Sequence, residues 1–137
     1  TSFTKSEDFQ VNLSWDPIKI VPGQNTNFIF TIRDGKTGEP LRNSDYTFVI
    51  IQNDKEIYKT TGTAQVGGEF ERYEFTKDQT GPTIIRFENI RNTGQETDFG
   101  VAVAPEFGTI ATMILFSTLL VVVLVSRNRF SKNLIFN

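Results

Sequence analysis

The residues able to do chemistry in this 137-residue chain are few, and their types exclude most catalytic mechanisms. The sequence contains no Cys and no His. It therefore lacks thiolate nucleophiles, His-based general acids and bases, and the commonest ligands of zinc, copper and haem iron. Lys and Arg number 14 against 16 Asp and Glu, so no overall positive charge is present to attract nucleic acid. We expect a non-catalytic protein with no cofactor, no metal centre and no nucleic-acid partner.

Three polar segments resemble binding sites, but the pattern of each favours a simpler interpretation. Residues 34–39 (DGKTGE) lack the dense acidic spacing of a calcium loop and predict a turn or hairpin instead. The Gly67-Gly68 pair precedes a predicted strand rather than a helix, so it does not match a phosphate-binding loop. A charge run on that strand is typical of a solvated face rather than of a carboxylate pair: Glu69, Glu71, Arg72 and Glu74.

One covalent modification is indicated by a motif. Asn12-Leu13-Ser14 is the only Asn-x-Ser/Thr sequence in the chain. Asn12 falls on the outward face of a predicted strand, where a glycan has room. Its position inside a strand rather than in a loop leaves an unmodified surface residue as the alternative.

The longest apolar segment predicts a membrane anchor. Residues 109–125 read TIATMILFSTLLVVVLV, without a charge, Pro, Asn or Gln. A helix of about 17–25 such residues crosses a bilayer. A buried core helix is the alternative, but a small domain rarely buries such a run on all sides. Gly108, Thr112 and Thr118 lie roughly on one stripe of this helix and form a possible helix-packing face.

Basic residues directly after this segment predict its orientation. Arg127, Arg129 and Lys132 are the stop-transfer cluster that places the C-terminus in the cytoplasm, by the positive-inside rule. The residues before the helix are then outside the cell. Since the sequence begins with Thr1, the simplest expectation is that a signal peptide has been removed, although the boundary of the sequence could itself be arbitrary.

A short motif separates the outer segment from the predicted helix: Pro105, Glu106, Phe107 and Gly108. Pro105 lacks an N–H group and ends a strand, while Gly108 leaves the backbone accessible. Followed by the apolar span and the basic cluster, the motif resembles the PEFG-CTERM sorting tail of surface proteins from ammonia-oxidising archaea of the thaumarchaeal group. The alternative is an ordinary strand-to-helix junction.

The resemblance covers residues 105–132 and implies processing by an archaeosortase, a membrane cysteine transpeptidase. Such an enzyme would recognise the four motif residues, cut near them and replace the helix with another anchor. The basic cluster would act as the stop-transfer signal. The resemblance also agrees with an extracytoplasmic β-domain ahead of the tail.

The first hundred residues predict such a domain, an immunoglobulin-like antiparallel β-sandwich. Apolar residues alternate with polar ones in short segments bounded by Gly, Pro, Asn and Asp, which is the pattern of half-buried strands. Segment 46–52 is apolar on both faces and predicts a central strand, whereas the polar segment 55–61 predicts an edge strand. Thirteen Phe residues are available to fill a core without disulfides. We expect seven or eight strands, over residues 9–15, 18–21, 26–33, 46–52, 55–61, 69–75, 83–90 and 97–103.

The sequence thus predicts an extracytoplasmic β-sandwich (1–104), a sorting-like junction (105–108), a transmembrane helix (109–125) and a basic cytoplasmic tail (126–137). The leading hypothesis is a single-pass cell-surface protein that mediates protein contacts, as an accessory subunit of a membrane complex such as ammonia monooxygenase. Its partners would be the membrane and other membrane protein subunits. The alternative is an archaeosortase-processed protein associated with the surface layer, or an adhesin. An enzyme or metal carrier would require metal ligands that the sequence does not offer.

Overall fold

The computed structural model describes residues 2–5 and 8–105. They belong to the first of two compact units of the chain, Thr1–Pro105. The predicted transmembrane helix (109–125) and basic tail (126–137) lie outside the described residues. Within the described part, no helix is both long enough and apolar enough to span a bilayer.

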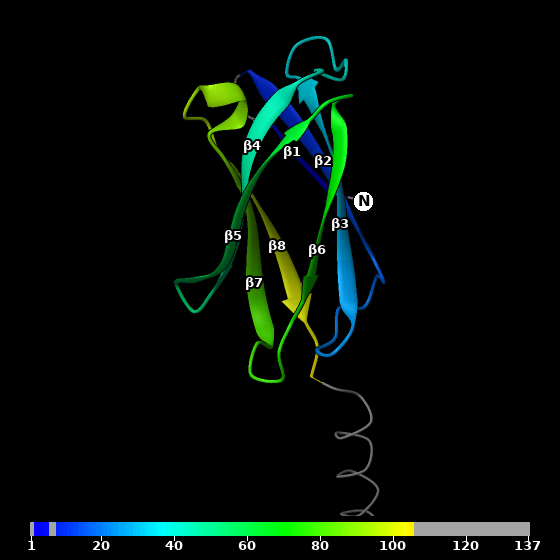
Figure 1. The fold of residues 1–137 in the computed structure, drawn as a ribbon, viewed down its shortest axis with the longest axis vertical. Helices are drawn as coiled ribbons and strands as arrows, with labels where there is room; N and C mark the ends of the chain where they lie inside the picture. The colour runs from blue at the N-terminus through cyan, green and yellow to red at the C-terminus, as the bar shows by residue number, and fades with distance from the viewer. Residues whose placement is uncertain (1, 6–7, 106–137) are drawn as a thin grey trace, which may run out of the picture. The chain divides into compact units, whose positions relative to one another are not determined.

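Two antiparallel sheets, packed face to face, make up the described domain (Figure 1). Sheet A has the strand order β1-β2-β3-β6, and sheet B has the order β5-β4-β7-β8. A short 3-10 helix, η1 (Ile90–Asn92), connects β7 to β8. The all-β, two-sheet prediction is therefore confirmed for this part of the chain. The strands are β1 (Ser2–Lys5), β2 (Phe9–Asp16), β3 (Asn25–Asp34), β4 (Ser44–Gln52), β5 (Lys55–Ala64), β6 (Gly68–Glu74), β7 (Gly81–Glu88) and β8 (Thr97–Val103).

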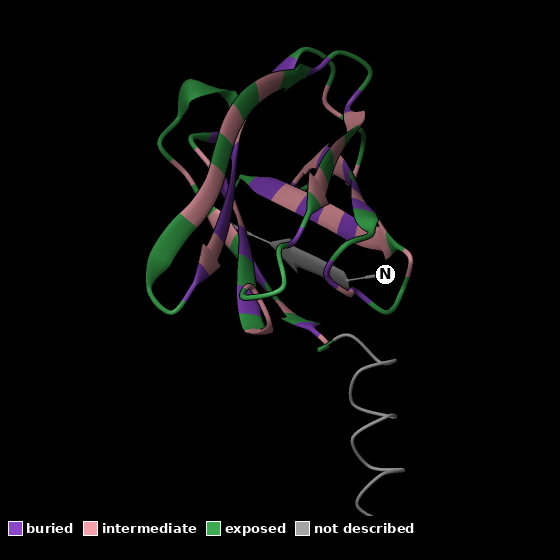
Figure 2. Cartoon of the chain, turned by 60° about the horizontal axis from the view of Figure 1, so that its bottom comes forward, coloured by how far each residue is buried: buried purple, intermediate pink, exposed green. Residues whose placement is uncertain are grey.

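Alternation along each strand decides which side chains enter the core. In β2, Phe9, Val11 and Leu13 are buried, whereas the residues between them are partly exposed. Figure 2 shows the same alternation of buried and less buried residues along strands of the domain. β4 lies between β5 and β7 as a central strand, and Val49 on its outer face is buried as well as its core-facing residues. β5 is an edge strand, as the sequence predicted.

Aromatic rings from both sheets fill the space between them. The ring centroid of Phe87 in β7 lies 4.6 Å from that of Phe30 in β3, 5.6 Å from Phe48 in β4 and 6.0 Å from Phe99 in β8. Phe28 of β3 reaches Phe48 across the sandwich at 5.7 Å. Burying a Phe side chain contributes about 1.5–3 kcal/mol. The aromatic cluster thus holds together two sheets that no disulfide joins.

The segment after β2 crosses from sheet A to sheet B. Ile20 forms one parallel bridge with Val103 of β8, and the Ala104 N–H group donates a hydrogen bond to the Ile20 carbonyl at 2.8 Å. The predicted strand over 18–21 is wrong, because only Ile20 pairs and Pro17 and Pro22, on either side, have no N–H group to donate to a ladder. Conversely, β1 pairs with β2 although four residues are too few to show a period.

The turn predicted over residues 34–39 is confirmed. The Asp34 carboxylate accepts hydrogen bonds from the backbone N–H groups of Lys36 at 2.8 Å and Thr37 at 3.0 Å. These two bonds, that from Thr37 first, lower the pKa of the Asp34 carboxyl. Asp34 therefore closes the turn.

One side-chain hydrogen bond links the sheets along their β5/β6 side. The buried Tyr46 of β4 donates its hydroxyl proton to Glu71 Oε1 of β6 at 2.6 Å. Gly62 of β5 lies opposite Tyr46, and a Cβ atom there would come within 2.5 Å of the hydroxyl oxygen. β5 therefore needs a glycine at this position. Glu71 departs from the predicted solvated charge run, because its carboxylate accepts this inter-sheet bond.

Replacing Gly62 with Ala should lower the free energy of unfolding by about 1–3 kcal/mol, because the new methyl group displaces the Tyr46 ring. Urea unfolding of the full chain in detergent micelles measures this through the fluorescence of Trp15, the single tryptophan. Gly100→Ala is the matched control, since a Cβ atom at that β8 position has nothing within 4 Å. Equal effects of the two changes would contradict the requirement for glycine.

Stability should also fall at alkaline pH. Burial, and then the hydrogen bond to Glu71, raise the pKa of Tyr46 above its usual value, whereas a tyrosine in the unfolded chain ionises near pH ~10. The Tyr46 hydroxyl therefore makes its full contribution to the free energy of unfolding below that pH, and this contribution is lost as the pH rises above it. The difference in urea midpoint between wild type and Tyr46→Phe should therefore shrink between about pH 9 and about pH 11. A constant difference would contradict the raised pKa.

Candidate interaction surface

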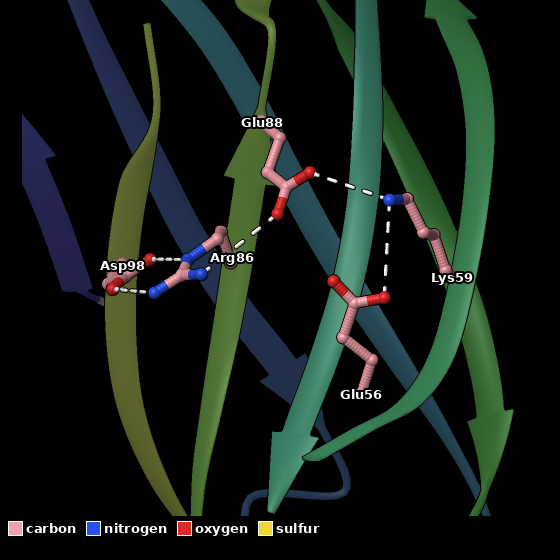
Figure 3. Close-up of polar contacts among 5 residues, drawn as sticks. All are labelled: Glu56, Lys59, Arg86, Glu88 and Asp98. Atoms are coloured by element: carbon pink, nitrogen blue, oxygen red, sulfur yellow. Dashed lines mark hydrogen bonds and ion pairs between the residues drawn. The ribbon is translucent and has the colours of Figure 1, made fainter. Parts of the chain in front are cut away.

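The outer face of sheet B carries charged side chains that pair with one another (Figure 3). Arg86 of β7 donates two hydrogen bonds to Asp98 of β8, at 2.7 Å to Oδ1 and 3.0 Å to Oδ2. This bidentate contact raises the pKa of the Arg86 guanidinium. Glu88 lies 4.0 Å from Arg86 and 3.8 Å from Lys59, which in turn lies 4.0 Å from Glu56. The five charges therefore find their counterions within the domain.

The same side chains flank an apolar residue. Val49 points to the outer face, because its neighbours Phe48 and Ile50 belong to the core, yet it is 0% exposed. Its cross-strand partners are Lys59 on one side and Arg86 on the other. Long basic side chains cover apolar neighbours with their aliphatic stems. On this part of sheet B, the charged groups are therefore paired and the apolar Val49 is covered by side chains of the same face.

A polar hollow of about 300 Å³ lies at the other end of the same face, between β4, β5 and η1. Its carboxylate belongs to Asp45, which accepts hydrogen bonds from the Thr63 hydroxyl at 2.5 Å and the Asn92 side-chain amide at 3.1 Å. These two bonds, that from Thr63 first, lower the pKa of Asp45. Since both carboxylate oxygens accept hydrogen bonds, one of them from Asn92 of η1, the cluster fastens η1 to the sheet.

Two exposed apolar side chains lie side by side on the outer face of sheet A. Ile29 of β3 is 47% exposed, Phe70 of β6 is 51% exposed, and the two are cross-strand partners. A hollow of about 500 Å³ adjoins them. Exposed aromatic and Arg side chains are enriched at protein interfaces. We call this surface the β3–β6 face and define it by Asn27, Ile29, Thr31, Gly68, Phe70 and Arg72.

Charges on the outer face of sheet A have no counterions of their own. Arg72 donates to the Asn27 side-chain oxygen at 3.0 Å, a neutral partner, and Asp16 is exposed at the end of β2. Glu74 is exposed at the end of β6. None of these three charged groups forms a salt bridge within residues 8–105. The two outer faces therefore differ, since the charged side chains around Val49 on sheet B pair with one another, whereas these three groups on sheet A do not.

The edge of β6 is protected against the addition of another strand. β6 is the last strand of sheet A, so its second edge has no partner within the sheet. Glu69 and Glu71 alternate with Phe70 and Arg72 and therefore point to the opposite side of the sheet from the β3–β6 face. Charges pointing inward at an edge discourage strand addition. A partner would therefore dock on the face rather than extend the sheet.

Of the site residues predicted from the sequence, the structure describes two. Asn12 lies on the outer face of sheet A, as predicted, where its side-chain oxygen accepts a hydrogen bond from Arg33 Nε at 3.0 Å. Pro105 is exposed, two residues beyond the end of β8. Asn12 is in sheet A, whereas Pro105 follows a strand of sheet B, and the two form no common site. The others lie outside the described residues: Glu106, Phe107, Gly108, Thr112, Thr118, Arg127, Arg129 and Lys132.

The sequence analysis did not single out Ile29 and Phe70, although each carries a weak signal. Ile29 is apolar but out of phase with its buried neighbours Phe28 and Phe30. Phe70 is likewise out of phase with Tyr73, which packs against the core. That the two are neighbours follows only from the β3–β6 register, which pairs segments far apart in the chain.

Comparison with known proteins identifies no family for this chain. The sequence matches no family model, and no curated protein matches it. Within the described part of the chain, no group of three or more potential ligands is placed to hold a metal ion. The function must therefore be inferred from the surface itself.

Phe70→Ser should change the free energy of unfolding by less than about 1 kcal/mol, because the ring is already half exposed. It should also reduce the binding of a hydrophobic dye to the folded protein. Phe87→Ser is the contrasting control: that ring is fully buried, so we expect a loss of more than about 3 kcal/mol. Urea unfolding followed by Trp15 fluorescence measures both, and a large loss for Phe70→Ser would show that the ring is packed.

Proposed function

We propose that this protein is a non-catalytic, single-pass protein of the cell membrane whose extracytoplasmic sandwich binds other proteins through the β3–β6 face. The observation that carries the proposal is the exposed Ile29–Phe70 pair beside charges without counterions. Apolar surface gains free energy when a partner removes it from water. An accessory subunit of a membrane complex is the leading role, and the resemblance of the tail makes ammonia monooxygenase the first complex to examine.

The anchor is supported by the sequence. The apolar residues 109–125 match the thickness of a bilayer, and the basic residues after them favour a cytoplasmic C-terminus. The domain before Pro105 would then lie outside the cell. A domain without Cys suits this location because its core is aromatic rather than cross-linked.

We further propose that the sandwich is immunoglobulin-like. Three connections, β3–β4, β5–β6 and β6–β7, join different sheets, as Greek-key connections do in that architecture. A central pair β4-β7 flanked by β5 and β8 also fits the larger sheet of such domains. The disulfide of antibody domains has no counterpart in this chain, since it contains no Cys.

The position of Pro105 favours a second role. In this role the chain is a surface protein processed by an archaeosortase, either associated with the surface layer or acting as an adhesin. This first residue of the motif is exposed beyond the last strand, so the motif begins outside the folded sandwich. The intact mass of the native protein separates the two roles. A mass that includes residues 106–137 supports the anchored protein, and a mass that ends near the motif supports processing.

Phe70→Asp should reduce the recovery of bound proteins at least about tenfold, since buried aromatic anchors contribute about 2 kcal/mol or more to an interface. The measurement is affinity purification of the full chain from detergent-solubilised native membranes, with a differently tagged second copy present, so that both foreign subunits and second copies are detected. Ile84→Asp is the matched control, because Ile84 is 37% exposed on the outer face of sheet B. Equal recovery with the two variants would contradict the proposed face.

A further inference from the structure

We propose that the β3–β6 face binds the same face of a second copy of this chain, with the two copies parallel about a two-fold axis that runs along β3. The inference rests on the proposed function and deepens it by naming the partner. Its basis is an arrangement of apolar and charged side chains that is complementary to itself.

Two rows of cross-strand neighbours cross sheet A from β2 through β3 to β6. The first is Ser14–Ile29–Phe70. The second is Asp16–Asn27–Arg72, which lies two residues away on each strand, toward the C-terminal ends of β2 and β6 and the N-terminal end of β3. Neighbours within a row have Cβ atoms about 5 Å apart. β1 pairs with β2 no further than Leu13, so these two rows end at β2 within the described residues. The second row therefore carries a negative charge at one end and a positive charge at the other.

A two-fold axis along β3 places β2 of each copy opposite β6 of the other copy. Ile29 then meets Ile29 of the second copy, and Phe70 lies over Ser14. Arg72 of each copy meets Asp16 of the other, so opposite charges pair twice. A two-fold contact uses one patch on both subunits and needs this kind of self-complementarity.

The geometry of packed sheets permits these contacts. Sheets pack face to face about 10 Å apart, with strands crossing at about 30°. Rows close to the crossing point stay in contact, whereas residues further along β3 diverge. Arg33 lies four positions beyond Ile29, where the two crossing β3 strands have diverged, and its guanidinium is held within its own copy by hydrogen bonds to the Asn12 side chain and the Gly38 carbonyl. The Arg33 side chains of the two copies, which carry the same charge, are therefore kept apart from each other.

The parallel arrangement follows from the anchor. A two-fold axis that lay in the interface but ran perpendicular to β3 would reverse one copy, so that the β8 strands of the two copies, and hence the two Pro105 residues, would end on opposite sides. Two chains anchored in one membrane need these ends on the same side. The outer face of sheet B is the poorer surface, because Arg86, Asp98, Glu88 and Lys59 already pair among themselves.

Cross-linking between thiols tests the axis. The chain has no Cys, so Ile29→Cys introduces a single thiol beside its own counterpart. Since a disulfide needs Cα atoms within about 7 Å, a bismaleimide with a short spacer is the suitable reagent for sheets about 10 Å apart. Full-length Ile29→Cys in native membranes should give a covalent dimer of twice the chain mass, several-fold more than Ile84→Cys on the outer face of sheet B. Equal yields would overturn the proposed axis.

Charge exchange in the same Ile29→Cys chain tests the register. Arg72→Asp alone and Asp16→Arg alone should each lower the dimer yield about fivefold or more, because like charges then face each other. The double variant should restore the yield, since opposite charges meet again with their positions exchanged. Both side chains are at the surface, and Trp15 fluorescence confirms that each variant is folded. Failure of the double variant to recover would overturn the pairing of Arg72 with Asp16.

The outcomes separate this inference from the function on which it rests. If Phe70→Asp loses a foreign subunit while Ile29→Cys gives no dimer, the second copy is the wrong partner and the contact function stands. If Phe70→Asp loses nothing and no dimer forms, both proposals fail. A dimer that depends on Phe70 and is restored by the charge exchange supports both.

Discussion

The packing of aromatic rings between the two sheets is the interaction on which the rest of the domain depends. Phe87 contacts rings from β3, β4 and β8, so one side chain joins both sheets. Because every second residue of each strand must enter this core, the intervening residues are committed to the outer faces. Even the bond between Tyr46 and Glu71 reaches the other sheet only because Gly62 leaves space beside the ring.

The outer faces of the two sheets differ in how far their side chains contact one another. On sheet B, acidic and basic side chains neutralise one another around Val49, so a partner that covered them would have to break existing contacts. On sheet A, Ile29 and Phe70 remain in water, and Arg72 has a neutral partner. A protein docking there would bury apolar surface and supply missing counterions. Charge pairing and the burial of apolar surface would therefore both favour docking on sheet A over docking on the part of sheet B around Val49.

A membrane anchor would change how much affinity such a face needs. Two proteins held in one membrane share an orientation and meet at a high effective concentration, so a small patch can suffice. The β3–β6 face is small and retains polar residues, which suits a contact formed between anchored proteins. The apolar segment 109–125 and the β3–β6 face would then serve one contact, although they lie on different parts of the chain.

The sequence by itself determined the all-β class, most strand positions, the turn at Asp34 and the use of Phe in the core, because alternation and turn residues are local signals. It did not reveal β1, which is too short to show a period, or the single pairing of Ile20 with Val103. Only the tertiary structure decided that Ile29 and Phe70 are neighbours and that Arg72 shares a row with Asp16. Register between strands distant in the chain sets those contacts, and no local pattern encodes it.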